Sequence, residues 1–203
     1  MDFRRVLFRS QQVSSTITFP MIQNNAGNQV YCDAAWRLGQ DKNATSAGLG
    51  VFIQLQQGQH CNYLYISAAS PPVSSVLQAE AFALLLAAKI ADLLDLQSSF
   101  YTDSSVLVKA VTAPNLLQAS GHWDTRPLLA NIQQCRSFKQ DQCYHIPRSF
   151  NYKSHHEARL ARKIQHMSFQ TRCLEDNQGH CPFSIVLTQA CVHPFTLLLV
   201  KCT

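Results

Sequence analysis

The sequence predicts a mixed α/β fold in which an antiparallel group of strands precedes alternating strands and helices. Three β-type runs occupy residues 29–36, 47–55 and 60–67, and a turn separates each run from the next. A segment rich in alanine and leucine then spans residues 76–94 with the spacing of a helix that has a wide buried face. Shorter strand and helix patterns follow it, which is typical of a sheet covered by helices.

The first three strands are expected to form an antiparallel meander. Residues 37–45 contain glycine, asparagine and lysine and provide the first turn, and residues 57–59 form a hairpin turn. The third strand is expected to stop before Pro71 and Pro72, because proline donates no ladder hydrogen bond. Either Ser74 or Ser75 could cap the helix that follows.

The second half of the chain is expected to add two strands and three helices. These are a strand at 99–102, a helix at 104–111 that ends before Pro114, a helix at 125–138 with Pro127 near its first turn, a strand at 142–146 and a helix at 154–164. The predicted order is therefore β-β-β-α-β-α-α-β-α, which gives a five-stranded mixed sheet flanked by helices.

Composition favours one domain with a polyanionic partner. The chain has 203 residues, of which 46% are hydrophobic and 14% charged, enough for one core plus some excess length. A formal net charge of +5 and a pI near 8.8 favour a polyanionic partner such as nucleic acid. No apolar run reaches the ~20 residues of a membrane span, so no membrane partner is expected.

The eight cysteines predict neither a disulfide framework nor a zinc site. Those in the first 150 residues are expected to be small core hydrophobes; they are Cys32, Cys61, Cys135 and Cys143. Among the four later cysteines and the later histidines, five residues could suggest a metal site but have no zinc-type spacing; they are Cys173, Cys181, Cys191, His180 and His193. A reducing, intracellular location (nucleus or cytoplasm) is the default expectation.

Both ends differ in character from the middle. Residues 1–10 fail as a signal peptide because no apolar core follows the arginines, and they resemble a translated sequencing adapter, although a basic arm for nucleic acid is an alternative. Residues 11–28 are typical of a linker. Residues 165–203 lose periodicity and predict a poorly structured tail, with a small packed extension as the alternative. The domain is therefore expected at residues 29–164.

Three acidic residues stand out in a chain that is poor in acid. Asp33 and Asp103 follow short β-type runs, and Glu80 lies on the long apolar helix. Clustered carboxylates are how proteins hold hard divalent cations. Each residue also has a structural alternative, since Asp33 could be a turn acid, Glu80 a boundary residue, and Asp103 the cap of the helix that follows it.

The order of elements and five short motifs resemble the ribonuclease H superfamily, and more narrowly the plant-type reverse-transcriptase-like RNase H domain. The motifs are Cys32–Trp36, Ala47–Val51, Gln78–Leu84, Tyr101–Ser104 and Ile146–Asn151. The resemblance covers about two-thirds of the chain, and its specificity comes from five motifs in the right order.

The resemblance implies a retroelement-type nuclease that cuts the RNA strand of an RNA/DNA hybrid with two Mg²⁺ ions, or with Mn²⁺. Asp33 would bridge the ions, and Glu80 and Asp103 would complete the protein ligands. The expected ion separation of about 4 Å would let the ions clamp the attacking and leaving oxygens. The RNA/DNA hybrid would be recognised by its backbone and 2′-hydroxyl groups.

Candidate nucleic-acid contacts lie around the expected metal site. They are Trp36, Arg37, Lys42, Asn43, Gln78, Lys109 and Arg148, with Arg126 and Lys153 as further candidates.

The sequence departs from the family at the expected fourth acid, four residues after Asn151, where His155 stands. Glu157 could replace that acid only if the helix begins differently, because two residues along a helix turn the side chain by roughly 200° and so place Glu157 and His155 on different faces. His155 could instead move a proton or help release product, and solvent-exposed histidines on the helix are the alternative. Two other hypotheses therefore remain, a retroelement-derived module that binds nucleic acid without turnover, and an inactive fragment of a truncated transcript.

Overall fold

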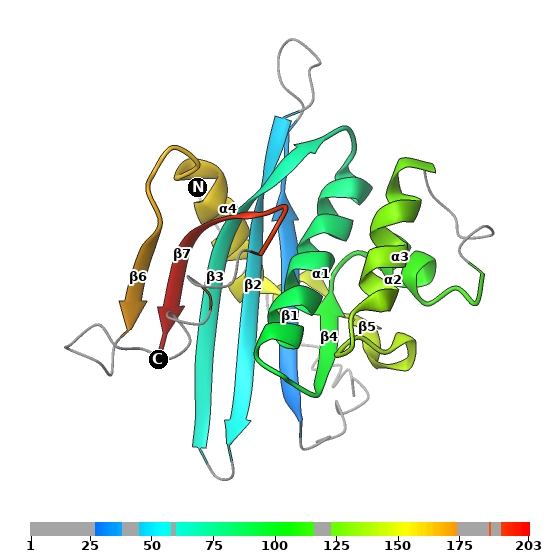
Figure 1. The fold of residues 1–203 in the computed structure, drawn as a ribbon, viewed down its shortest axis with the longest axis horizontal. Coiled ribbons are helices and arrows are strands. Elements are labelled where there is room, and N and C mark those ends of the chain that lie inside the picture. The colour runs from blue at the N-terminus through cyan, green and yellow to red at the C-terminus, as the bar shows by residue number, and fades with distance from the viewer. Residues whose placement is uncertain (1–26, 38–44, 58–59, 116–122, 174–186, 188–191) are drawn as a thin grey trace, which may run out of the picture.

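The computed structural model describes residues 27–37, 45–57, 60–115, 123–173, 187 and 192–203, and these form one sheet with helices on both faces (Figure 1). The strands are β1 (Asn28–Ala35), β2 (Thr45–Gln57), β3 (His60–Val73), β4 (Ser98–Thr102), β5 (Cys143–His145), β6 (Gln170–Cys173) and β7 (Thr196–Cys202). The helices are α1 (Val76–Leu93), α2 (Ser105–Val111), α3 (Arg126–Gln134) and α4 (Tyr152–Lys163). Short 3₁₀ turns occupy Trp123–Thr125, Gln140–Gln142 and Arg148–Phe150.

The sheet is mixed, as predicted, and its strand order is β5-β4-β1-β2-β3-β7-β6. The strands β1, β2 and β3 pair antiparallel, and β4 and β5 run parallel to β1. This confirms the predicted β-β-β-α-β-α-α-β-α order for the central part of the chain. None of the described helices has the length and apolar composition of a membrane span.

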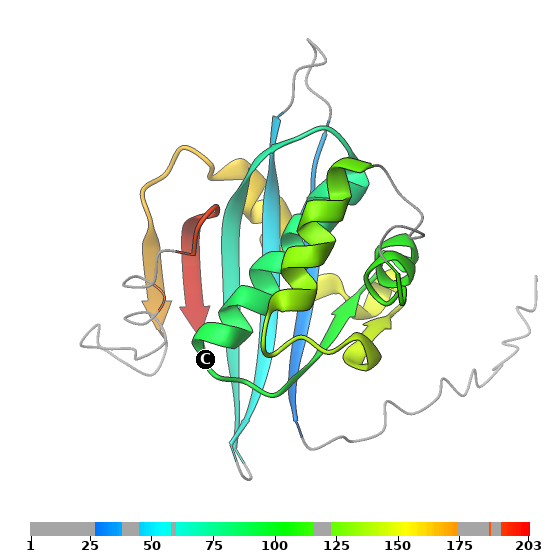
Figure 2. The same cartoon turned by 45° about the vertical axis from the view of Figure 1, so that its right-hand side comes forward.

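Helices α1, α2 and α3 cover one face of the sheet, and α4 covers the other (Figures 1 and 2). The side chain of Ser75 caps α1 by accepting a hydrogen bond from the backbone N–H of Gln78 at 3.1 Å. Nearly every residue of α1 from Ala79 to Ala91 is buried, and its many alanines let the helix lie close to the strands. The core therefore lies between α1 and the sheet.

Two glycines on β2 let α4 lie directly on the sheet. A Cβ atom at Gly48 would clash with the backbone of Ala158 and Arg162, and one at Gly50 with the backbone of Ser154 and Ala158. Because helix backbone cannot move aside as a flexible side chain can, these positions exclude any larger residue. The glycine motif of the second strand thus sets the position of α4.

We expect Gly50→Ala to lower the free energy of unfolding by about 3 kcal/mol, because overpacking must displace α4. Urea denaturation at equilibrium measures this change. The exposed substitution Ser105→Ala is the control, with an expected change within about 0.5 kcal/mol. A Gly50→Ala protein as stable as the wild type would contradict the close approach of α4 to β2.

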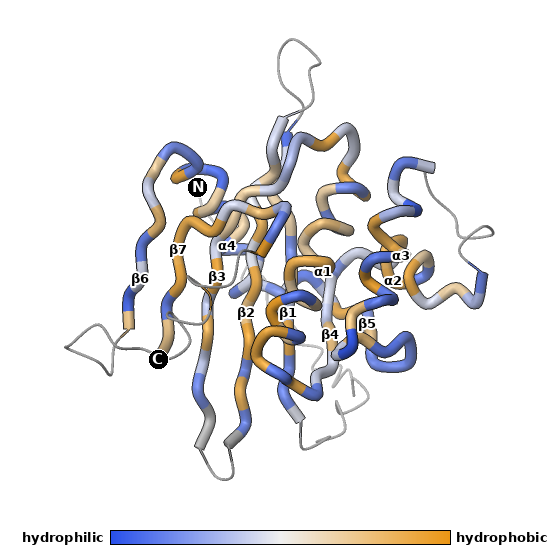
Figure 3. The backbone as a smooth tube through the Cα atoms, viewed as in Figure 1, coloured by the Kyte–Doolittle hydropathy of each residue, from blue (hydrophilic) through white to orange (hydrophobic). Residues whose placement is uncertain are grey.

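The structure differs from the sequence prediction at the C-terminal segment, where two strands extend the sheet to seven. Strand β7 pairs antiparallel with β3, and β6 pairs parallel with β7. Figure 3 shows that β7 is apolar over most of its length, and Leu198 and Val200 are buried. A poorly structured tail was therefore the wrong expectation for these two segments, because an apolar run becomes a strand once the edge of β3 offers it a partner. Residues 174–186 and 188–191 lie outside the described residues.

The third strand also runs further than predicted. Strand β3 continues to Val73, and Pro72 pairs with Ser46 near the end of the ladder. Proline is tolerated near a strand end, where a missing N–H donor breaks little of the ladder. The prolines therefore mark the end of the strand, a few residues later than expected.

Strand β7 is tied to α4 by a buried ion pair. Glu157 on α4 is 1% exposed, and its carboxylate accepts hydrogen bonds from Lys201 Nζ at 2.6 Å and from Ser67 Oγ at 2.7 Å. The side chain of Glu157 therefore points towards β3 and β7, so this residue does not replace the family's fourth acid.

We expect Lys201→Met to destabilise the protein by about 2 kcal/mol, because it leaves the buried carboxylate of Glu157 without its counter-charge. Chemical denaturation of the full chain measures the effect. The exposed Lys139→Met is the control and should change the free energy of unfolding by less than about 0.5 kcal/mol. Equal stability of the two variants would contradict a structural role for the ion pair.

Candidate metal centre and nucleic-acid cleft

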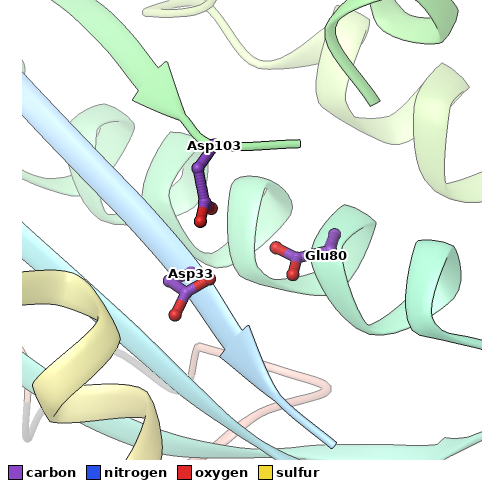
Figure 4. A group of neighbouring side chains, drawn as sticks. All are labelled: Asp33, Glu80 and Asp103. Atoms are coloured by element: carbon purple, nitrogen blue, oxygen red, sulfur yellow. The ribbon is translucent and has the colours of Figure 1, made fainter. Parts of the chain in front are cut away.

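Three carboxylates from three different elements converge at one edge of the sheet (Figure 4). Asp33 lies near the end of β1, Asp103 directly follows β4, and Glu80 lies in the second turn of α1. Because β1 and β4 are parallel neighbours, their carboxyl ends meet at the same edge. One oxygen from each residue lies within 4.8 Å of the others, which is compatible with shared metal coordination. We call these three residues the carboxylate cluster.

Burial makes the carboxylate cluster unusual. Asp33 is 3% exposed and Glu80 is 9% exposed, and Asp103 is half-buried. The Oε2 atom of Glu80 is buried and has no hydrogen-bond partner among the residues that the structure describes. An unpaired buried carboxylate oxygen is costly, and a bound cation would remove that cost. The donor set therefore fits a hard divalent ion.

The structure also distinguishes a metal site from the structural alternatives for the three acids. Ser104, not Asp103, caps α2, because its side chain accepts a hydrogen bond from Leu107 N at 3.3 Å. Asp33 lies within β1 rather than in a turn, and Glu80 is buried rather than at the helix boundary. The three acids thus lack the structural roles that could have explained them.

Burial and mutual repulsion favour the protonated forms of Asp33 and Glu80. Burial is the main cause that raises the pKa of Asp33 to about 6, and the nearby Asp103 adds to the rise. The hydrogen bond from His155 opposes it. Burial also raises the pKa of Glu80 well above its usual value, with further contributions from the charges of Asp33 and Asp103. A divalent cation would reverse this preference by stabilising the ionised forms.

His155 occupies the side of the carboxylate cluster where the fourth acid was expected. Its Nδ1 atom lies 2.5 Å from Oδ2 of Asp33, and its Nε2 atom lies 3.2 Å from a guanidinium nitrogen of Arg148. These contacts fit the tautomer in which Nδ1–H donates to Asp33 and Nε2 accepts from Arg148. The side chain is 25% exposed, so the ring reaches solvent as well as Asp33.

Asn151 connects the segments that carry Asp33 and Asp103. It is buried, and its side-chain amide donates to the carbonyl oxygen of Cys32 at 2.9 Å and to Oδ1 of Asp103 at 3.2 Å. Ser154 in turn donates its hydroxyl hydrogen to the side-chain oxygen of Asn151. One residue therefore links the start of α4 to the ends of β1 and β4.

The carboxylate cluster opens into a cleft of about 620 Å³, which we call the carboxylate cleft. Its lining includes three residues predicted to contact nucleic acid, namely Trp36, Arg37 and Arg148. The indole N–H of Trp36 donates to Oγ1 of Thr45 at 3.0 Å, which fixes the ring at the edge of the cleft.

Other predicted contacts do not line the carboxylate cleft. The side-chain oxygen of Gln78 accepts a hydrogen bond from Ser74 N at 2.7 Å, so it stabilises the start of α1. Lys109 is exposed on α2, and Lys153 lies on a different face of α4. Arg126 is half-buried at the start of α3. Lys42 and Asn43 lie outside the described residues.

Two arginines that line the carboxylate cleft were missed. Arg159 and Arg162 lie on the same face of α4 as His155. Spacings of four and three residues along a helix place side chains on one face, so the predicted helix and His155 together contained this signal. The positioning role of Asn151 depends on tertiary hydrogen bonds and has no comparable local signal.

Most of the described domain matches one known protein family. A family model described as reverse transcriptase-like matches residues 32–161, which includes the carboxylate cluster and most of α4. No curated protein sequence matches the chain.

Solved RNase H structures have the same fold. LC11-RNase H1, isolated from compost by metagenomics, is 21% identical with a TM-score of 0.53, over 70% of this chain and 99% of its own. RNase H1 of Halobacterium salinarum is 19% identical with a TM-score of 0.50, over 67% and 97%. A foamy viral protease-reverse transcriptase bound to an RNA/DNA hybrid is 16% identical with a TM-score of 0.52, over 66% and 20%. At these identities the likeness establishes the RNase H-like α/β fold.

Proposed function

This chain belongs to the reverse transcriptase-like family, and we propose that it is a metal-dependent ribonuclease that cuts the RNA strand of an RNA/DNA hybrid. The convergence of Asp33, Glu80 and Asp103 within 4.8 Å carries the proposal. The plant-type subgroup is part of this proposal, because plant members of the family often carry histidine at the position of the fourth acid, where this chain has His155.

The carboxylate cluster would hold divalent ions, with Mg²⁺ preferred and Mn²⁺ as an alternative, because all its ligands are oxygens. When bound there, two such ions would lower the pKa of a water nucleophile and stabilise the charge that develops on the phosphate. By the resemblance, Asp33, Glu80 and Asp103 would hold the ions together, with Asp33 shared between them, and each of the three offers an oxygen within 4.8 Å of the others. Among the described residues, Oε2 of Glu80 is the oxygen of the carboxylate cluster that is buried without a hydrogen-bond partner, so a bound cation would satisfy it.

The rest of the carboxylate cleft fits a polyanionic substrate. Arg37, Arg148, Arg159 and Arg162 line it together with Trp36. Guanidinium groups bind phosphate through paired donors, and such contacts position a duplex without reading its sequence. His155 has a ring nitrogen near Asp33 and access to solvent, so it could hold or release a proton during the reaction.

Two related folds support the choice of substrate by analogy. LC11-RNase H1 has been solved in complex with an RNA/DNA hybrid, and so has the foamy viral protease-reverse transcriptase. This chain shares their fold and has an acidic cluster in a basic cleft. An RNA/DNA hybrid is therefore the first substrate to test.

The test compares four end-labelled duplexes in Mg²⁺ and in EDTA, namely RNA/DNA hybrid, double-stranded RNA, double-stranded DNA and a hybrid with a non-hydrolysable RNA strand. The proposal expects internal cuts in the RNA strand of the normal hybrid alone, and only with the metal. Cutting that persists in EDTA, or no cutting of the hybrid by folded protein, would contradict it.

A second candidate is a retroelement-derived module that binds nucleic acid without turnover. The observation that favours it is His155, which replaces a metal-holding carboxylate with a base that bonds to Asp33. It predicts salt-dependent binding of the hybrid without cleavage, and gain of cleavage in His155→Asp. Cleavage by the wild-type protein would rule it out.

A further inference from the structure

A second basic hollow lies along α4, next to the carboxylate cleft. It measures about 740 Å³ and is bounded by α4, by Tyr65 of β3 and by Lys201 of β7. We call it the α4 groove. We propose that the α4 groove binds the phosphate backbone of a single-stranded polynucleotide that extends from the carboxylate cleft. This proposal rests on the proposed function for the duplex part of the substrate.

Positive charge in the α4 groove exceeds negative charge. Its cationic side chains are Lys153, Arg159, Lys163 and Lys201, and its single acid is the buried Glu157. Because Lys201 is paired with Glu157 at 2.6 Å, the other three cations provide the net charge. Arg159 and Lys163 are exposed and make no ion pair with any residue that the structure describes. A polyanion would supply the missing partners.

The exposed groups of α4 form a stripe along the groove. Tyr152, His156, Arg159 and Lys163 are spaced by four, three and four residues, which places them on one side of the helix. The helix rises about 16 Å from the first to the last of them, a length over which an extended strand presents several phosphates. The stripe therefore fits a linear polyanion better than a single small anion.

Two aromatic residues, Tyr65 and Tyr152, also line the groove. Tyr152 is 62% exposed and offers a free ring face at the start of the stripe. Lys153 Nζ lies 4.2 Å from the centre of the Phe52 ring and 5.9 Å from that of Tyr65, so rings of the sheet hold this ammonium group in place. Cations combined with exposed aromatic rings are how proteins bind unpaired nucleotides, because every base has a face that can stack.

The α4 groove is continuous with the carboxylate cleft. His155 and Arg159 line both hollows, so they mark a path across α4 from the carboxylate cluster to the groove. Exposed Tyr152 favours an unpaired strand over a duplex, since bases in a duplex are already stacked on each other. A single-stranded extension of the hybrid is therefore the occupant that both the charge and the rings fit.

The experiment measures binding in EDTA, where the proposed cleavage cannot occur. Fluorescence anisotropy compares a blunt RNA/DNA hybrid with the same hybrid carrying a single-stranded extension. The extension is RNA in one series of measurements and DNA in a second series. We expect the wild-type protein to bind the extended hybrid about tenfold more tightly. The double variant Tyr152→Ala/Lys163→Ala should lose this gain in affinity. A plot of its log binding constant against log salt concentration should have a slope smaller by about 0.7 than that of the wild type, because one phosphate contact is lost.

The matched control is Tyr144→Ala/Lys139→Ala, which removes an exposed tyrosine and an exposed lysine away from the α4 groove and should keep the gain. Circular dichroism confirms that both double variants fold. The proposal is overturned if the extension adds no affinity, if the groove variant keeps the gain, or if the control loses as much. Failure of the proposed function would appear separately, as no cleavage of the blunt hybrid in Mg²⁺, while the free single strand would still bind the wild type more tightly than the groove variant.

Discussion

Asp33→Asn is expected to lower the rate of hybrid cleavage by at least about 10³-fold, while the metal-free protein stays folded. Asp33 is one of the three acids of the carboxylate cluster, and it accepts a hydrogen bond from His155. Asparagine keeps the shape of the side chain but removes the charge that would hold the ions. A loss of this size corresponds to about 4 kcal/mol of transition-state stabilisation, which is reasonable for one metal-holding group.

Single-turnover cleavage of a labelled hybrid in saturating Mg²⁺ measures this effect directly. The exposed Asp141→Asn makes the same chemical change away from the carboxylate cleft and should retain the wild-type rate. Cleavage by Asp33→Asn within tenfold of the wild type would show that the carboxylate cluster does not carry the reaction. Binding of the hybrid should persist, because the arginines of the cleft are unchanged.

Glu80→Gln is expected to abolish cleavage to a similar extent and yet to stabilise the metal-free protein. The side chain of Glu80 is buried beside two other acids, and these conditions raise its pKa well above the usual value. A neutral amide removes the repulsion and can donate hydrogen bonds to the neighbouring carboxylates. We expect a gain of ~1 kcal/mol at neutral pH, which raises the melting temperature by about 3 °C for a chain of this length.

The extra stability of metal-free Glu80→Gln over the wild type should depend on pH. A carboxyl whose pKa is raised in the folded state binds its proton more tightly there than in the unfolded chain, so its ionised form destabilises the fold. That destabilisation is present above the raised pKa and disappears as the pH falls towards the value of the unfolded chain. The advantage of Glu80→Gln over the wild type should therefore shrink on acidification.

Thermal melts in EDTA and in Mg²⁺, at several pH values, measure both effects. Mg²⁺ should raise the melting temperature of the wild type, because the ion binds only the folded carboxylate cluster, and should raise that of Glu80→Gln less. The control is Asp95→Asn, which neutralises an exposed acid and should alter neither the effect of pH nor that of Mg²⁺. A Glu80→Gln protein that melts lower than the wild type in EDTA would contradict the electrostatic account.

Much of the carboxylate cleft could be predicted because its residues lie in short motifs with local signals. Asp33 lies near the end of one β-type run, Asp103 follows another, Glu80 interrupts an apolar helix, and His155 stands at a fixed distance from Asn151. The antiparallel meander and the crossover to β4 then bring the three acids together, since parallel strands end at one edge.

The features that were missed depend on contacts between distant segments. The apolar residues of β7 have no strand-like alternation, and only the edge of β3 makes them a strand. The ion pair between Lys201 and Glu157 joins that strand to α4, and neither residue alone predicts it. Pairing between segments far apart in the sequence carries little local signal, so one sequence alone does not reveal it.

The central claim is that Asp33, Glu80 and Asp103 hold divalent ions, and crystals soaked in Mn²⁺ test it most directly. The account predicts anomalous-scattering peaks within about 2.2 Å of carboxylate oxygens of all three residues, and their loss in Asp33→Asn. Well-ordered crystals of the wild-type protein with no manganese at the carboxylate cluster would contradict it.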